Sequence, residues 1–165
     1  MFELDDSDYE PLAKFGLLWR WTSPRYNELP IDALQRIRPL AHERAALVSD
    51  YAVRRVHRRY PDLGVNPDSV HDIQVIDANR EPESAVKDWL LALPVSVDET
   101  VIVSWNASLA VTAPFALIAE YWSDFFYGAS EDAAIVPPSV AWMLVWDHEE
   151  HFSFGITSQK PPKAR

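Results

Sequence analysis

The sequence predicts an α+β fold, in which a mainly antiparallel sheet of about four to six strands packs against helices. Three observations lead to this prediction. Hydrophobic residues make up 48% of the 165-residue chain, enough for one sizeable core. Short apolar runs of strand length alternate with stretches whose apolar residues recur at helical spacing. No segment resembles an interdomain linker, so we expect one domain over residues 1–156 and a flexible tail over residues 157–165.

The first 60 residues are predicted to contain short elements followed by a long helix. Residues 15–21 form a short strand or helical turn, which Pro24 ends. Asp32 is placed to cap a helix, which Pro39 ends or kinks. From residue 40 to residue 59, apolar side chains recur at helical spacing and predict a long helix.

Basic residues gather toward the C-terminal end of this long helix. They are Arg44, Arg54, Arg55, Arg58 and Arg59. Positive charge is favourable there because it complements the negative end of the helix dipole. A phosphate or nucleic-acid site would need a glycine-rich loop or an aromatic-rich sheet beside them, and the sequence has neither. We interpret the arginines as a patch that binds the acidic half of this protein or a partner.

The rest of the chain is predicted to supply the sheet. Strand-like runs cover residues 70–78, 101–105, 109–112, 133–136, 140–146 and 152–154. Both faces of the run at 140–146 are apolar, which predicts a strand in the middle of the sheet with both faces covered. Helical spacing predicts helices at residues 83–93 and 115–126, and Gly128 ends the second. Residues 147–150 are predicted to form the polar turn of a hairpin.

Charge is distributed unevenly along the chain. The formal net charge is −10, yet residues 66–156 carry fifteen acidic residues against two basic ones, Arg80 and Lys87. An acidic half repels phosphates, which argues against nucleic acid and anionic lipid as ligands of that surface. It attracts a basic partner instead, although solubility alone also favours an acidic surface.

The lack of cysteine and of secretory or membrane-spanning segments bears on the cellular compartment of the protein. There is no cysteine, so disulfides and thiol chemistry are excluded. The first residues lack the positive charge and apolar run of a secretory signal, and no apolar run approaches the roughly 18–20 residues that span a bilayer. We therefore expect a cytoplasmic protein with no membrane span.

The segment His148-Glu149-Glu150-His151 is the densest group of metal-binding residue types. A zinc protease motif needs two histidines four residues apart on a helix, whereas these are three apart and lie between predicted strands. Neighbouring side chains of a strand point to opposite faces, so the two glutamates are not expected to converge as a catalytic pair. We predict a solvated hairpin turn with no metal, no cofactor and no catalytic residue, and we favour a non-catalytic function.

An aromatic and acidic pattern runs through the last third of the chain. It consists of Tyr121-Trp122-x-Asp124-Phe125, then Trp142-x-Leu144, then His148-Glu149-Glu150-x-Phe152-x-Phe154-Gly155. The pattern resembles a family of small uncharacterised bacterial proteins, whose general type is that of toxin-neutralising immunity proteins. This resemblance implies an acidic, single-domain inhibitor, and it supplies no catalytic residues.

The leading functional prediction is a binding protein whose acidic surface occludes a basic toxin or nuclease. The predicted contact residues are Asp124, Glu131, Asp132, Asp147, Glu149 and Glu150. Opposite charge would speed the encounter with a cationic partner. Asp124 also has a simpler interpretation, as an exposed carboxylate on a helix.

Two other functions remain open. The first is a small-molecule-binding or hydrolytic domain with an aromatic pocket between helix and sheet, lined by Trp122, Trp142, Trp146 and His148. Indole side chains at this spacing also fit an ordinary core. The second is an oligomeric scaffold that uses exposed aromatic residues. The sequence predicts neither the identity of a partner nor the oligomeric state.

Overall fold

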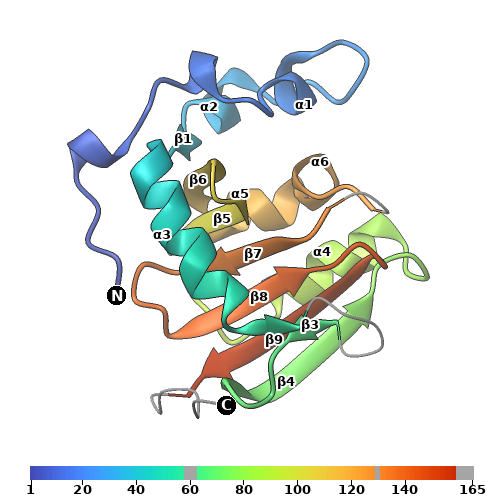
Figure 1. Cartoon of the computed structure of the whole chain (residues 1–165). Helices are drawn as coiled ribbons and strands as arrows, with labels where there is room; N and C mark the ends of the chain where they lie inside the picture. Colours follow the sequence, from blue (N-terminus) through green and yellow to red (C-terminus); the bar gives the residue numbers. More distant parts are fainter. Residues whose placement is uncertain (58–62, 129–130, 159–165) are drawn as a thin grey trace.

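The computed structural model describes residues 1–57, 63–128 and 131–158, and its centre is an antiparallel sheet (Figure 1). Seven strands of the described chain form this sheet. From one edge to the other they are β1 (Arg38–Pro39), β6 (Leu109–Pro114), β5 (Thr100–Asn106), β7 (Ala133–Val136), β8 (Trp142–Trp146), β9 (His151–Thr157) and β4 (Val70–Asp77). A separate small hairpin pairs β2 (Val56–His57) with β3 (Gly64–Val65).

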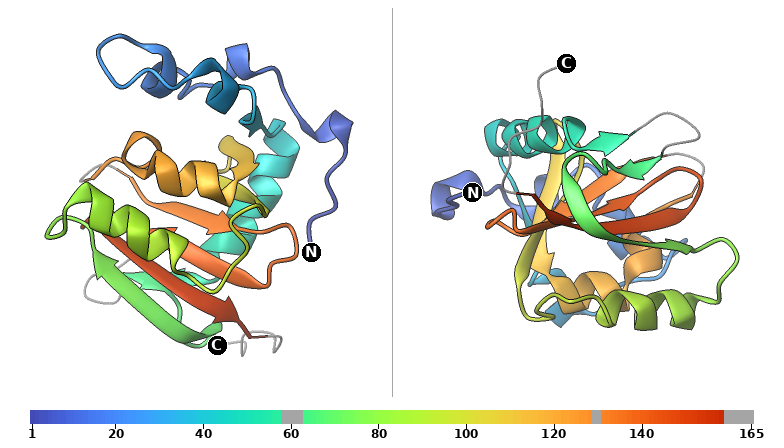
Figure 2. Two further views of the ribbon diagram at one scale, coloured as in Figure 1. Left: turned by 180° about the vertical axis from the view of Figure 1, so that it is seen from behind. Right: turned by 90° about the horizontal axis from the view of Figure 1, so that it is seen from below.

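Helices cover both faces of the sheet. In the described chain they are α1 (Trp19–Thr22), α2 (Ile31–Leu34), α3 (His42–Val53), α4 (Glu83–Leu91), α5 (Phe115–Glu120) and α6 (Trp122–Phe125), with 3-10 turns at Asp6–Asp8 and Leu12–Lys14. Helix α3 and the small hairpin lie on one face, and α4, α5 and α6 lie on the other (Figure 2). The N-terminal segment that carries α1 and α2 packs against this second group.

Two hydrophobic cores result, one on each face of the sheet. Strand β8 shows how the sequence produces them, because its side chains alternate between the faces. Trp142, Leu144 and Trp146 belong to the larger core beneath α4, α5 and α6. Met143 and Val145 belong to the smaller core beneath α3. The prediction of a central strand with both faces covered is therefore confirmed.

The predicted α+β class is confirmed, and each predicted strand is present as β4, β5, β6, β7, β8 or β9. The helix predicted over residues 83–93 is α4 and ends at Leu91, and two other helix predictions differ further from the structure. The helix predicted over residues 40–59 ends at Val53, because the chain then turns into β2 and pairs with β3. The helix predicted over residues 115–126 is divided into α5 and α6 at Tyr121, whose φ of −114° and ψ of 30° leave the helical region.

The N-terminal region differs further from prediction. Asp32 lies inside the first turn of α2, and Pro30 occupies the position before that helix. Pro39 belongs to β1, where it is paired with Val111 of β6. A proline is tolerated there because β1 is an edge strand, bordered on its outer side by an isolated bridge of Leu40 with Tyr9 and not by another strand of the sheet. This short seventh strand was not predicted.

The C-terminal boundary lies slightly beyond the predicted one. Thr157 is still part of β9 and is paired with Val70 of β4, so the sheet continues past residue 156. The rest of the predicted tail, from residue 159 to residue 165, lies outside the described residues. Among the helices of the described chain, none has the length and apolar character needed to cross a membrane.

Candidate functional site

The loop between α1 and α2 lies beside α6, and two buried side chains fix it there. The indole N–H of Trp21 donates a 3.1 Å hydrogen bond to the carbonyl oxygen of Asp124. The guanidinium of Arg20 donates to the carbonyl oxygen of Phe125 at 3.1 Å. Trp21 is fully buried and packs against the ring of Phe125, with centroids 4.8 Å apart. These contacts place residues 25–30 next to the last turn of the α5–α6 pair.

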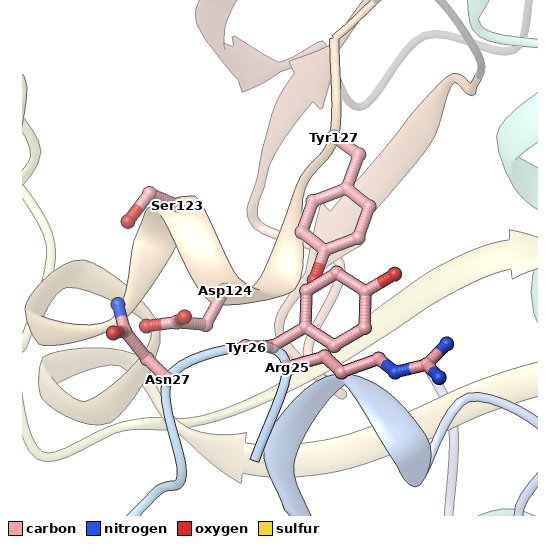
Figure 3. Close-up of a pocket in the computed structure, with 6 residues that line it drawn as sticks. All are labelled: Arg25, Tyr26, Asn27, Ser123, Asp124 and Tyr127. Atoms are coloured by element: carbon pink, nitrogen blue, oxygen red, sulfur yellow. The ribbon is translucent and has the colours of Figure 1, made fainter. Parts of the chain in front are cut away.

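Between this loop and α6 lies an open pocket of about 490 Å³, which we call the Asp124 pocket. It is lined by Arg25, Tyr26, Asn27, Ser123, Asp124 and Tyr127. Figure 3 shows the amide of Asn27 beside the carboxylate of Asp124, and the rings of Tyr26 and Tyr127 next to each other. The side chain of Arg25 extends away from Asp124.

The carboxylate of Asp124 is held in an unfavourable environment for a charge. The residue is only 8% exposed, and this burial raises the pKa of its carboxyl group. A hydrogen bond from the Asn27 side chain lowers the pKa in part, and the nearby charge of Glu83 raises it further. Within the described chain, no lysine, arginine or histidine forms an ion pair with Asp124. A perturbed carboxyl group in a pocket marks a functional-site candidate.

A second depression of about 420 Å³ adjoins the first and shares Asn27 and Asp124 with it. Its walls are Asn27, Glu28, Leu29, Pro30, Glu83, Glu120, Tyr121 and Asp124. We call it the acidic groove, because four of these side chains are carboxylates. Glu83 accepts a 2.8 Å hydrogen bond from the hydroxyl of Ser123, and Glu120 pairs with Lys87 at 2.5 Å.

The two tyrosines of the Asp124 pocket wall, Tyr26 and Tyr127, pack against each other and against Trp19. The rings of Trp19 and Tyr26 have centroids 4.9 Å apart, and Tyr127 lies within 6.1 Å and 6.2 Å of them, respectively. Trp19 is 41% exposed and Tyr26 is 46% exposed. The guanidinium of Arg20 lies 4.3 Å from the centre of the Tyr127 ring and makes two 2.6 Å hydrogen bonds to Glu131.

The six predicted contact residues do not form one outward-facing surface. Asp124 and Asp147 are buried, so they do not belong to an exposed acidic surface, and the interpretation of Asp124 as an exposed helix carboxylate is wrong. Asp124 also faces the loop of residues 25–30 and not the hairpin. Glu131 forms a salt bridge with Arg20, and Asp132 accepts hydrogen bonds from the backbone N–H and the ring of His148. The six residues are therefore divided between two regions and largely engaged within the protein.

The turn between β8 and β9 holds the predicted His148–His151 cluster. Asp147 accepts hydrogen bonds from the backbone N–H groups of Glu149 and His151, at 3.0 and 3.3 Å, and so organises the turn. Glu149 is exposed and Glu150 is half-buried. Glu150 has a φ of 65°, a left-handed conformation suited to a tight turn. Within the described residues, no group of three or more histidine and carboxylate side chains is arranged to hold a metal ion.

His148 takes part in a polar pair on the surface of this hairpin. Its ring Nδ1 lies 2.8 Å from the carboxylate of Asp132. This hydrogen bond raises the pKa of His148 above its ordinary value of 6.5. The charges of Asp132, Glu149 and Asp147 act in the same direction. The observed contacts of His148 are thus those of a hairpin residue and not of a pocket between helix and sheet.

The three tryptophans of the predicted aromatic pocket fill the larger core. Trp122, Trp142 and Trp146 are all buried, and the rings of Trp122 and Trp146 both pack against Phe152. Each indole N–H donates a hydrogen bond: Trp122 to the Glu83 carbonyl, Trp142 to the Glu99 carboxylate and Trp146 to the Tyr127 carbonyl. Their structural role follows from these contacts.

The arginines of the predicted long helix have different partners. Arg44 pairs with the buried Asp8 of the N-terminal segment, and Arg54 pairs with Asp50 one turn earlier in α3. Arg55 lies over the ring of Tyr51, 3.8 Å from its centre. The described side-chain contacts of these three arginines thus do not reach residues 66–156. Arg58 and Arg59 lie outside the described residues.

Sequence reasoning missed most of the residues that form the two depressions. These are Arg25, Tyr26, Asn27, Glu28, Glu83, Glu120 and Tyr127. A signal was present in the polar and aromatic run from Arg25 to Glu28, which sits between Pro24 and Pro30 and has no helix or strand periodicity. Comparison with protein-family models, curated proteins and solved structures gave no match to this chain. The family resemblance of the C-terminal third therefore stays a prediction.

Proposed function

We propose that this chain is a non-catalytic binding protein that holds a basic protein partner on its acidic groove, in the manner of an immunity protein that neutralises a cationic toxin or nuclease. One observation carries the proposal. Glu28, Glu83, Glu120 and Asp124 come from three separate parts of the chain and meet at one depression. Lys87 is the only basic residue that forms an ion pair with any of the four within the described chain. Their combined field favours a cationic ligand.

The surroundings of the groove suit a protein partner. Exposed aromatic rings are typical anchors of protein interfaces, and here Tyr26 lines the adjoining Asp124 pocket while Trp19 packs against it. Charges at the rim of an interface mainly raise the association rate and set the salt dependence. We therefore expect fast binding that weakens as salt rises, because the Debye length falls from about 10 Å at 0.1 M to about 3 Å at 1 M.

The test uses two double variants that lose equal charge. Glu28→Gln with Glu83→Gln alters the groove, whereas Glu149→Gln with Glu150→Gln alters the hairpin, and both sets keep the shapes of the side chains. The natural chain and both variants are immobilised and exposed to the purified basic proteins encoded beside the gene for this chain. Association rates are measured by biolayer interferometry at about 0.1 M salt, where surface charges still interact over about 10 Å.

Binding by the natural chain and the hairpin variant, with a reduced association rate for the groove variant, supports the proposal. Equal binding by the natural chain and the groove variant places the partner elsewhere and overturns it. Absence of binding by the natural chain to every neighbouring basic protein also overturns it.

A further inference from the structure

Asp124 differs from the other buried acids of the described chain in how its charge is satisfied. Asp8 pairs with Arg44 and accepts a 2.8 Å hydrogen bond from the backbone N–H of Asp5. Asp147 accepts from two backbone N–H groups and lies 3.4 Å from a ring nitrogen of His151. Asp124 has only the amide of Asn27, and Glu83 adds a like charge nearby. A buried carboxylate without a cation or several donors costs free energy, and functional sites are where such costs persist.

The surroundings of this carboxylate are specific in shape as well as charge. Asp124 lines both depressions, so a cationic chain lying in the acidic groove passes directly over it. On the side of the Asp124 pocket, the rings of Tyr26 and Tyr127 are stacked at an interplanar angle of 27°, with centroids 6.2 Å apart. A carboxylate beside flat aromatic rings matches a flat cation that can pair and stack at once.

The guanidinium group of arginine is such a flat cation, whereas the ammonium group of lysine is not. It is planar, presents a fork of N–H donors that fits a carboxylate, stacks on aromatic rings and is more weakly hydrated than a lysine ammonium group. Within the described chain, arginine side chains already stack on tyrosine rings, and two of them, Arg20 and Arg38, also pair with a carboxylate. Arg20, Arg38 and Arg55 lie over the rings of Tyr127, Tyr9 and Tyr51, at 4.3, 3.6 and 3.8 Å from the ring centres.

We infer that the Asp124 pocket is an anchor site for a single arginine side chain of the partner. The guanidinium donates to the Asp124 carboxylate and stacks on the ring of Tyr26, while Asn27 orients the carboxylate. This inference rests on the proposed function, since it assumes that a basic chain occupies the acidic groove. It adds that recognition depends on arginine and not merely on positive charge.

Arg25 is the one cation among the residues of the pocket wall. Its side chain extends away from Asp124, so it does not supply the missing partner (Figure 3). A positive charge at the wall opposes an incoming guanidinium. Replacing Arg25 with glutamine is therefore expected to strengthen arginine binding modestly.

The test is a titration of the full-length ¹⁵N-labelled chain with two blocked pentapeptides, Gly-Gly-Arg-Gly-Gly and Gly-Gly-Lys-Gly-Gly, followed by NMR. The arginine peptide is expected to shift the resonances of residues 25–27 and 123–127 in a saturable way and to bind about tenfold more tightly than the lysine peptide, which corresponds to about 1.4 kcal/mol. Asp124→Asn is expected to abolish this preference. Tyr26→Leu, on the exposed loop, removes the stacking surface without touching the core and is expected to reduce the preference severalfold. Glu149→Gln is the control and should leave it unchanged.

Other outcomes separate this inference from the proposed function. Equal, groove-dependent binding of the two peptides overturns the arginine anchor and leaves the acidic groove as a general cation-binding surface. Failure of both peptides to shift these resonances, when a basic protein partner does bind through the groove, also overturns the anchor alone. Full retention of the arginine preference in both Asp124→Asn and Tyr26→Leu places the anchor elsewhere.

Discussion

The hairpin between β8 and β9 and the acidic groove beside α6 both gather carboxylates, but they use them differently. At the hairpin, Asp147 and Asp132 accept hydrogen bonds from the turn that they border, so their charge holds the local structure. In the groove, Asp124 is buried without a cation and Glu28 lies exposed on a loop. The comparison teaches that carboxylates with several hydrogen-bond donors nearby have a structural role. Carboxylates that converge with few donors or cations around them instead mark a candidate ligand site.

Arg20→Ala is expected to have the largest effect, because it removes the support of the groove. Arg20 is buried, makes two 2.6 Å hydrogen bonds to Glu131 and donates to the Phe125 carbonyl. Its loss leaves Glu131 half-buried without its cation, and we expect the free energy of unfolding to fall by about 3–5 kcal/mol. Urea denaturation measures this change. Arg54→Ala, which removes an exposed ion pair on α3, should lower the free energy of unfolding by less than about 0.5 kcal/mol. Equal losses in the Arg20 and Arg54 variants would refute the supporting role of Arg20.

Asp147→Ala is expected to have the next largest effect and tests the structural role of the hairpin acids. The substitution removes the buried carboxylate that accepts hydrogen bonds from the N–H groups of Glu149 and His151. We expect a loss of about 1–3 kcal/mol in the free energy of unfolding. Glu149→Ala, at an exposed position of the same turn, should change stability by less than about 0.5 kcal/mol. A stable Asp147→Ala variant would remove the distinction between the two regions.

Asp124→Asn is expected to act in the opposite direction and to stabilise the protein at neutral pH. Burial raises the pKa of Asp124 in the folded state above its ordinary value of 3.8, so its charged form destabilises the fold. The advantage of the variant is complete above the raised pKa. It shrinks as the pH falls through that value toward 3.8, because the natural carboxyl group then becomes neutral too. Thermal denaturation between pH 4 and pH 8 measures the stability difference between the variant and the natural chain. A variant less stable than the natural chain at pH 7 would contradict an unfavourable charge at Asp124.

His148→Gln is expected to have the smallest effect. Asp132 raises the pKa of His148, so the pair stabilises the fold fully below the ordinary value of 6.5 and loses this contribution as the pH rises through the raised pKa. The side chain is 41% exposed, so solvent screening limits the contribution to less than about 1 kcal/mol. Stability of the natural chain should fall slightly between pH 6 and pH 8, and the variant should lack this slope. If the variant keeps the same dependence of stability on pH, this dependence comes from a group other than His148.

The sheet was predictable because its signal is local. Strands such as β5 and β8 are runs of apolar residues bounded by turns, and their alternation gives both cores. Strand β1 was not predictable, since two residues, Arg38 and Pro39, carry no periodicity. The ends of the helices were also missed, because pairing of Val56 in β2 and the break at Tyr121 depend on contacts formed elsewhere in the fold.

The candidate site was harder to predict than the fold, since it depends on contacts between distant residues. The sequence places Asp147, Glu149 and Glu150 together, which favoured the hairpin as the acidic surface. Glu28 and Glu83 become neighbours only when the loop after α1 packs on α6. Asp124 was predicted as a contact residue, but its burial follows from tertiary packing and could not be read from helical spacing.

The attachment of the N-terminal segment to α6 has a consequence for when the protein can bind. The hydrogen bond from Trp21 to Asp124 joins residues that are 103 positions apart in the sequence. Closing such a long loop is entropically costly. Contacts of this kind therefore stabilise the chain only after much of it has folded. If the chain holds a basic partner as proposed, only molecules in which this packing is complete would capture it, and a bound partner would in turn protect them against unfolding by mass action. Nascent or damaged copies, which lack one wall of the groove, would not compete for the same target.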